Sequence, residues 1–308
     1  MGGEGSWGYL DFEPVMRRLF ISRATKVVVL DVDSGKVAGE ILNTPGVHGV
    51  ALAPDLGRGF TSNSEGNNVT VFDLETFKTI VDVPAGMEPD TIVYDPSSKR
   101  TFAMNAHSQN ITAIDAATGR MITTLAVHGR PESAVADGGG RIYVNIADRN
   151  EQAAIDSQNL AVTGRWSISP CNGPTGIAMD VPHRRLFAAC SNRMMIVSDA
   201  DSGKVISNQP IDQGADSIAY DPATGYILSS NGDSGTLTVV HEDTPNNYTF
   251  VEVVITELHA RTMALDRKNG QIFLVAAAYQ DPLPQAKDAV PAPPVLVPGS
   301  FVVLVYGK

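Results

Sequence analysis

The chain has 308 residues, with 23 Lys and Arg against 34 Asp and Glu, which gives a formal net charge of −11. This length is ample for a buried core, and the acidic balance, without any Lys- or Arg-rich run, argues against a nucleic-acid partner. Apolar residues stay in runs shorter than the roughly 18 needed to cross a bilayer, so we expect no membrane span.

A six-residue phrase, Arg-Leu-Phe-Ile-Ser-Arg at 18–23, opens a repeat with a period of about 42 residues. Its other copies lie at 58–63, 100–105, 141–146, 185–190, 225–230 and 271–276. A second phrase, rich in β-branched residues, follows each copy, at 26–31, 68–73, 110–115, 151–156, 194–199, 236–241 and 301–306. An aspartate precedes each copy, at Asp11, Asp55, Asp95, Asp137, Asp180, Asp221 and Asp266. Short β-branched or aromatic segments bounded by turn residues predict strands, and this period is typical of propeller blades.

The sequence therefore predicts one all-β domain over 1–308, a seven-bladed β-propeller of four-stranded antiparallel blades. The seventh blade ends on its third strand at Tyr306, so we expect its outer strand to be missing. We also expect a leader and a closing strand to have been removed from ahead of Trp7. A Pro-rich insertion at 279–299 links the second and third strands of blade seven, and both a lid and a plain linker fit its composition.

Several segments resemble the YVTN-repeat β-propeller family over nearly the whole chain. Tyr143-Val-Asn145 is similar to the phrase that names the family, 176–180 is similar to its first strand, and 114–119 is similar to its third-strand turn. The resemblance implies the propeller fold and an exported bacterial protein. It implies no activity, because the shared motif consists of strands and turns.

Two cysteines occupy neighbouring strand ends in the predicted fifth blade. Cys171 precedes the first strand and Cys190 ends the second, antiparallel strand, which favours a disulfide. The alternative is a pair of buried free thiols. A disulfide suits an oxidising compartment, so we expect a periplasmic or secreted protein whose signal peptide has been removed.

The order of strands places the loops before each first strand and after each second strand at one end of the propeller, which we call the loop face. Loops on a rigid scaffold commonly carry function, and the innermost strands surround a central channel, so we predict a binding site at the channel mouth on this face. Its candidate residues are Tyr9, Arg23, His48, Asn63, Asp90, Asn105, Glu132, Asn145, Asp216, Asn231 and Arg261. His183 and His241 fall on the opposite face, here called the turn face, and receive no role.

We expect a monomeric, exported binding or interaction protein that holds a small molecule or a protein partner at this mouth, without a resident cofactor and with no assigned catalytic residue. The alternative is a metal-assisted hydrolase or lactonase-like enzyme at the same mouth. Calcium or zinc would then be held by Asp90, Asn105 and Glu132, while Arg261 and His48 would stabilise or protonate the developing oxyanion. Capping of loop backbones by Asp, Glu and Asn explains these residues without chemistry, which favours the binding protein.

Overall fold

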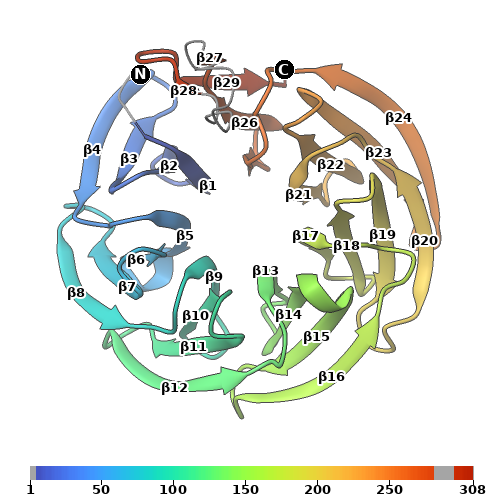
Figure 1. Cartoon of the computed structure of the whole chain (residues 1–308), viewed down its shortest axis with the longest axis horizontal. Coiled ribbons are helices and arrows are strands. Elements are labelled where there is room, and N and C mark those ends of the chain that lie inside the picture. Colours follow the sequence, from blue (N-terminus) through green and yellow to red (C-terminus); the bar gives the residue numbers. More distant parts are fainter. Residues whose placement is uncertain (1–4, 281–294, 308) are drawn as a thin grey trace, which may run out of the picture.

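A computed structural model describes residues 5–280 and 295–307 and shows seven β-sheets arranged radially around a central axis (Figure 1). The predicted all-β, seven-bladed propeller is confirmed. Each blade is antiparallel, and its strands follow one another outward in sequence order, so that the first strand lines the channel.

The strands of the seven blades have the following bounds. Blade one holds β1 (Trp7–Glu13), β2 (Arg18–Arg23), β3 (Lys26–Asp31) and β4 (Lys36–Leu42). Blade two holds β5 (Val47–Ala53), β6 (Arg58–Asn63), β7 (Asn68–Asp73) and β8 (Thr79–Pro84). Blade three holds β9 (Pro89–Asp95), β10 (Arg100–Asn105), β11 (Asn110–Asp115) and β12 (Arg120–Ala126). Blade four holds β13 (Pro131–Ala136), β14 (Arg141–Ile146), β15 (Glu151–Asp156) and β16 (Ala161–Ser167). Blade five holds β17 (Pro174–Asp180), β18 (Arg185–Cys190), β19 (Met194–Asp199) and β20 (Val205–Pro210). Blade six holds β21 (Ala215–Asp221), β22 (Tyr226–Asn231), β23 (Thr236–Thr244) and β24 (Asn247–Ile255). Blade seven holds β25 (Met263–Asp266), β26 (Gln271–Ala276) and β29 (Val302–Tyr306).

Apolar packing between neighbouring sheets forms the core. The aromatic position of the first phrase supplies a fully buried ring in most blades, as with Phe20, Phe60 and Phe102. Blade seven closes on blade one in the same way, because Phe12 and Phe273 pack with their ring centroids 5.3 Å apart. The Thr262 hydroxyl adds a hydrogen bond to the Gly8 carbonyl oxygen across this junction, at 2.9 Å.

Within the described residues, blade seven has three strands, as expected, and β29 is its outer strand. Residues 1–4 and 281–294 lie outside the description, so the closing strand and the lid or linker role of the insertion are not addressed. The two ends of the insertion pair as a short ribbon of β27 (Tyr279–Gln280) and β28 (Val295–Leu296). Tyr279 packs against Trp7 and His259, which fixes the base of the insertion beside the loop face.

The aspartates that precede the copies of the first phrase occupy equivalent positions in five blades, whereas Asp11 and Asp55 of the first two blades do not. Glu13, not Asp11, ends β1 and caps the following turn, where its carboxylate accepts the backbone N–H groups of Val15 and Met16. Asp55 lies in a short 3₁₀ helix, η1 (Pro54–Leu56). In blade one, spacing alone could not separate Asp11 from Glu13, because a two-residue offset keeps a side chain on the same face of a strand.

The predicted disulfide between Cys171 and Cys190 is confirmed, with the two Cα atoms 5.5 Å apart. It ties the segment ahead of β17 to the end of β18 inside blade five. No helix in the described part of the chain is long and apolar enough to span a membrane. Its helices are η1 and η2 (Ala147–Arg149), each of three residues.

Candidate functional site

A ring of polar side chains surrounds the channel at the loop face, and we call it the channel ring. Five of its members are the second residue of an innermost strand: His48, Asp90, Glu132, Thr175 and Asp216. Tyr9 from β1 and Arg261, just ahead of β25, complete it. Glycine allows the close approach of two blades at this level, since a Cβ on Gly176 would lie 2.8 Å from the Asp216 carbonyl oxygen.

Contacts between blades hold the ring together. His48 Nδ1 lies 2.5 Å from Asp90 Oδ1, which pairs blades two and three. The Tyr9 hydroxyl donates to Asp216 Oδ1 at 3.1 Å, which joins blades one and six. Arg261 Nε lies 3.3 Å from Asp216 Oδ2, and the edge of the Tyr9 ring meets the His48 ring. Residues far apart in sequence thus form one polar cluster.

Two ring carboxylates have an oxygen that is buried without a hydrogen bond, Asp90 Oδ1 and Glu132 Oε2, but only the Asp90 oxygen has a close charged neighbour, in His48. Oε2 is buried without a hydrogen bond and lies 3.4 Å from Arg130 NH1, a long ion pair with a half-exposed guanidinium. The Glu132 side chain itself is 13% exposed. A buried acceptor without a hydrogen bond is costly, so a donor supplied by a ligand would stabilise it.

The ring shifts the pKa values of its own members. Burial, reinforced by the charge of Asp90, raises the pKa of Glu132 to about 7. Burial also raises the pKa of Asp216, against the opposing charges of Arg261 and His48. Burial alone would lower the pKa of His48, but contact with Asp90 outweighs it and leaves that pKa raised. Burial, followed by the charge of Asp216, raises the pKa of Tyr9. The side chains therefore sense one another across the channel.

Six of the eleven predicted site residues form the ring, and the other five are buried at or next to the ends of second strands, one strand further from the channel: Arg23, Asn63, Asn105, Asn145 and Asn231. Asn105 is representative, since its amide donates to Asn110 Oδ1 and Thr112 Oγ1 of the adjacent strand. The Arg23 guanidinium stacks over Phe301 at 3.7 Å from the ring centroid. The Asn145 amide instead donates to the carbonyl oxygens of Thr175 and Gly176 in blade five, so it braces the ring from behind.

Of the predicted metal ligands, Asp90 and Glu132 are members of the ring and Asn105 is not, and a metal held by all three stays a prediction. Asn105 lies on β10, not on the innermost strand, and its amide nitrogen donates within blade three to Asn110 Oδ1 and Thr112 Oγ1. Among the described residues, one group of three His, Cys, Asp or Glu side chains has its potential ligand atoms within 4.8 Å of one another. That group, Asp180 with His183 and Glu242, lies on the turn face and not in the ring.

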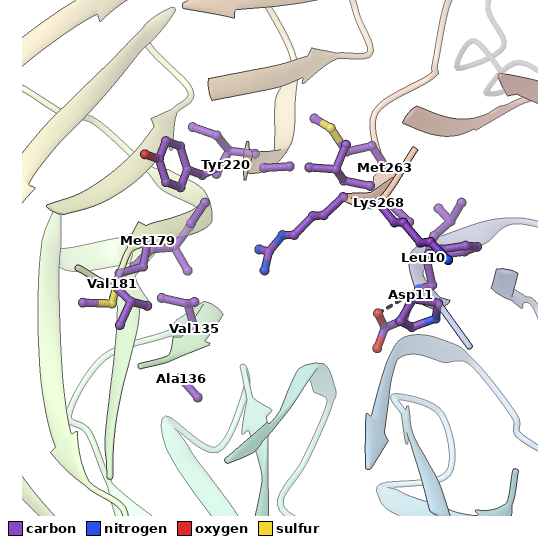
Figure 2. Close-up of a pocket in the computed structure, with 18 residues that line it drawn as sticks. Leu10, Asp11, Val135, Ala136, Met179, Val181, Tyr220, Met263 and Lys268 are labelled. Atoms are coloured by element: carbon purple, nitrogen blue, oxygen red, sulfur yellow. Dashed lines mark hydrogen bonds between the residues drawn. The ribbon is translucent and has the colours of Figure 1, made fainter. Parts of the chain in front are cut away.

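Deeper in the channel, toward the turn face, lies a cavity of about 630 Å³. Side chains from five blades line it, and Figure 2 shows Leu10, Val135, Met179, Tyr220 and Met263 among them. Most of the lining residues are apolar, but three charged residues also line the cavity: Asp11, Arg267 and Lys268. Burial raises the pKa of Asp11 to about 7. The cavity begins one or two residues beyond the ring on several innermost strands, so ring and cavity are successive layers of one channel.

Sequence reasoning missed Thr175, Arg130 and the cavity. Thr175 could have been found by aligning the repeats at the start of each first strand, because it occupies the position of His48 and Asp90. The cavity carries no comparable signal, since its lining residues resemble ordinary core residues.

Comparison with known proteins shows the fold and nothing finer. No family model and no curated protein matches the chain, so the resemblance to YVTN-repeat propellers stays a prediction. A solved structure titled "Kuenenia stuttgartiensis Hydrazine Synthase" is similar, with a TM-score of 0.76 and 16% identity over 86% of this chain and 91% of that chain. One titled "Crystal Structure of Mitotic Checkpoint Complex" gives 0.76 and 14% over 87% and 83%. At these identities the likeness is to the propeller scaffold, which serves many unrelated functions.

Proposed function

We propose that the propeller is a binding protein that holds a small polar molecule at the channel ring. The observation that carries this proposal is the convergence of one polar side chain from each blade on a single level of the channel. The carboxylates Asp90, Glu132 and Asp216 are only 13–21% exposed. A small molecule can reach such recessed groups more readily than the flat surface of a protein can.

The chemistry of the ring favours a zwitterion, a molecule with an ammonium group and a carboxylate. An ammonium group would donate to the buried Glu132 oxygen that has no hydrogen bond. A carboxylate would accept from Arg261 and Arg130, whose side chains are 44% and 52% exposed. Free amino acids and small betaines are the simplest members of this class.

A thermal-shift panel of zwitterions, amines, carboxylates and neutral sugars tests the proposal. Zwitterions should raise the melting temperature of the parent protein and leave that of Glu132→Gln unchanged. Glu257→Gln is the matched control, because Glu257 is an exposed carboxylate on the same face. A panel in which no zwitterion stabilises the parent, or stabilises Glu132→Gln equally, would overturn the proposal.

One observation favours a second candidate, an acid–base hydrolase. A carboxyl group with a pKa of about 7, as in Glu132, suits proton transfer near neutral pH. Such an enzyme would hydrolyse a lactone or activated ester with a rate that falls at least tenfold in Glu132→Gln. Equal rates in the two proteins would remove this candidate.

We propose further that the protein is exported to the periplasm or secreted, with the Cys171–Cys190 disulfide as the support. Thiol-reactive mass tagging of protein taken from intact cells should leave both cysteines unlabelled. Full labelling would place the chain in a reducing compartment.

A further inference from the structure

The turn face carries a second polar cluster, at the junction of blades five and six. Asp180 ends β17, His183 lies in the following turn, and Glu242 lies in β23. Their potential ligand atoms lie within 4.8 Å of one another, and His183 Nδ1 lies 2.6 Å from Asp180 Oδ2. Asp180 and Glu242 are buried, at 1% and 8% exposure, whereas the imidazole is 55% exposed.

The equivalent junction between blades three and four shows which side chains meet at this position elsewhere in the repeat. Ser157 and Glu242 occupy equivalent positions in their blades. In blade four, Arg141 begins the second strand and pairs with Asp156, and Ser157 follows Asp156. In blade six, Tyr226 begins the second strand and pairs with His241, and Glu242 follows His241. Asp95 and Asp180 are equivalent at the end of the first strand in the preceding blade. Between blades three and four, the Ser157 hydroxyl donates to Asp95 Oδ2 at 2.6 Å. Between blades five and six the donor is replaced by a second carboxylate.

The Asp180 carboxylate also differs from the equivalent aspartates, such as Asp95, which accept hydrogen bonds from backbone N–H groups of the turn that follows. Asp95 accepts the backbone N–H groups of Ser97 and Ser98. The residue two beyond Asp180 is Pro182, which has no N–H to donate. The Asp180 carboxylate contacts the His183 ring instead.

Glu242 supplies an independent sign of a missing partner. Its Oε1 accepts from the Tyr248 hydroxyl at 3.2 Å, and the Tyr220 hydroxyl also contacts the carboxylate and opposes the rise of its pKa, while Oε2 is buried without a hydrogen bond of regular geometry. Burial raises the pKa of this carboxyl, and the charge of Asp180 adds to the rise. The guanidinium of Arg185 does not neutralise the pair, because it contacts Asp199 Oδ2 and the Pro245 carbonyl oxygen.

We propose that Asp180, His183 and Glu242 bind a divalent cation of the zinc class between blades five and six. Two carboxylates and one imidazole form a ligand set suited to zinc and related first-row ions, which take such ligands at about 2.0–2.2 Å. The ion would supply the positive charge that the two buried carboxylates lack. The exposed imidazole leaves one side of the site open to water, so the ion would also have free coordination positions. This site is separate from the channel ring and does not depend on the function proposed for it.

Calorimetric titration of the metal-free protein with ZnCl₂ is the test. The parent should bind one equivalent, and His183→Ala and Glu242→Gln should each weaken that binding at least tenfold. His241→Ala is the matched control, because His241 is a neighbouring imidazole that pairs with Asp243 on the same face and stands outside the cluster. It should bind zinc as the parent does. CoCl₂ should give visible absorption bands in the parent and in His241→Ala but not in His183→Ala.

Two outcomes would overturn the proposal. One is no stoichiometric binding to the parent. The other is binding that survives both His183→Ala and Glu242→Gln, which would place the ion elsewhere, and loss in His48→Ala would then identify the channel ring. Melting of each variant in EDTA checks folding. Glu242→Gln is expected to be at least as stable as the metal-free parent, because it removes a buried charge that faces Asp180.

Discussion

Glu132→Gln is expected to stabilise the protein at alkaline pH and to leave it unchanged at acidic pH. The carboxyl has an ordinary pKa of 4.5, which burial and the charge of Asp90 raise to about 7 in the folded protein. Below pH 4.5 it is protonated in both the folded and the unfolded state and costs nothing. Between pH 4.5 and about 7 the unfolded state ionises this carboxyl while the folded state still holds its proton, so the free energy of unfolding falls across that interval and stays reduced above it.

The size of the effect follows from the two pKa values. At about 1.4 kcal/mol per pH unit, the interval from 4.5 to about 7 corresponds to roughly 3 kcal/mol at pH 8. Glutamine has nearly the same shape and no charge, so the variant escapes this penalty. Urea denaturation at pH 4.5, 6 and 8 measures the difference in the free energy of unfolding between the two proteins.

Glu257→Gln serves as the control, because this exposed side chain should give a difference near zero at every pH. A difference for Glu132→Gln that does not grow between pH 4.5 and pH 8 would refute the reasoning. Such a result would mean that water solvates the Glu132 carboxyl and that the charge of Asp90 does not raise its pKa.

Two further substitutions test the scaffold. Cys171→Ser opens the bridge to Cys190, which closes a segment with a sequence separation of 19, and should lower the free energy of unfolding by about 3 kcal/mol. Dithiothreitol should have the same effect on the parent and none on the variant. Ser157→Ala removes the buried hydrogen bond to Asp95 and should cost about 2 kcal/mol. Ser202→Ala, at an exposed turn, should cost about 0.5 kcal/mol or less, and equal losses at the two serines would contradict the account.

Much of the fold could be predicted because the same local pattern recurs in every blade. The predicted second strands at 18–23, 58–63 and 100–105 coincide with β2, β6 and β10. The weakest copy, predicted at 225–230, is displaced by one residue in β22, where Tyr226 begins the strand and stands at the position of Arg18. The pattern is strong where an aromatic residue fills the contact between two blades and weak where it does not.

The site was harder to predict because topology fixes the face but not the direction of a side chain. Asn105 and Asp90 lie at the same end of blade three, yet only Asp90 is on the innermost strand. Asn105 lies one strand further out, where its amide ties β10 to β11. The pairing of Asp180 with Glu242 depends on how two blades pack, and nothing local in the sequence reports it.

Methyl NMR on protein labelled at Thr and Met tests the central claim most directly. Thr175 lies in the channel ring, whereas Met179 and Met263 line the deeper cavity. On titration with a zwitterion that stabilises the protein, the Thr175 methyl signal should shift in the parent and stay fixed in Glu132→Gln. Shifts of Met179 and Met263 without Thr175, or shifts confined to outer strands, would contradict binding at the ring.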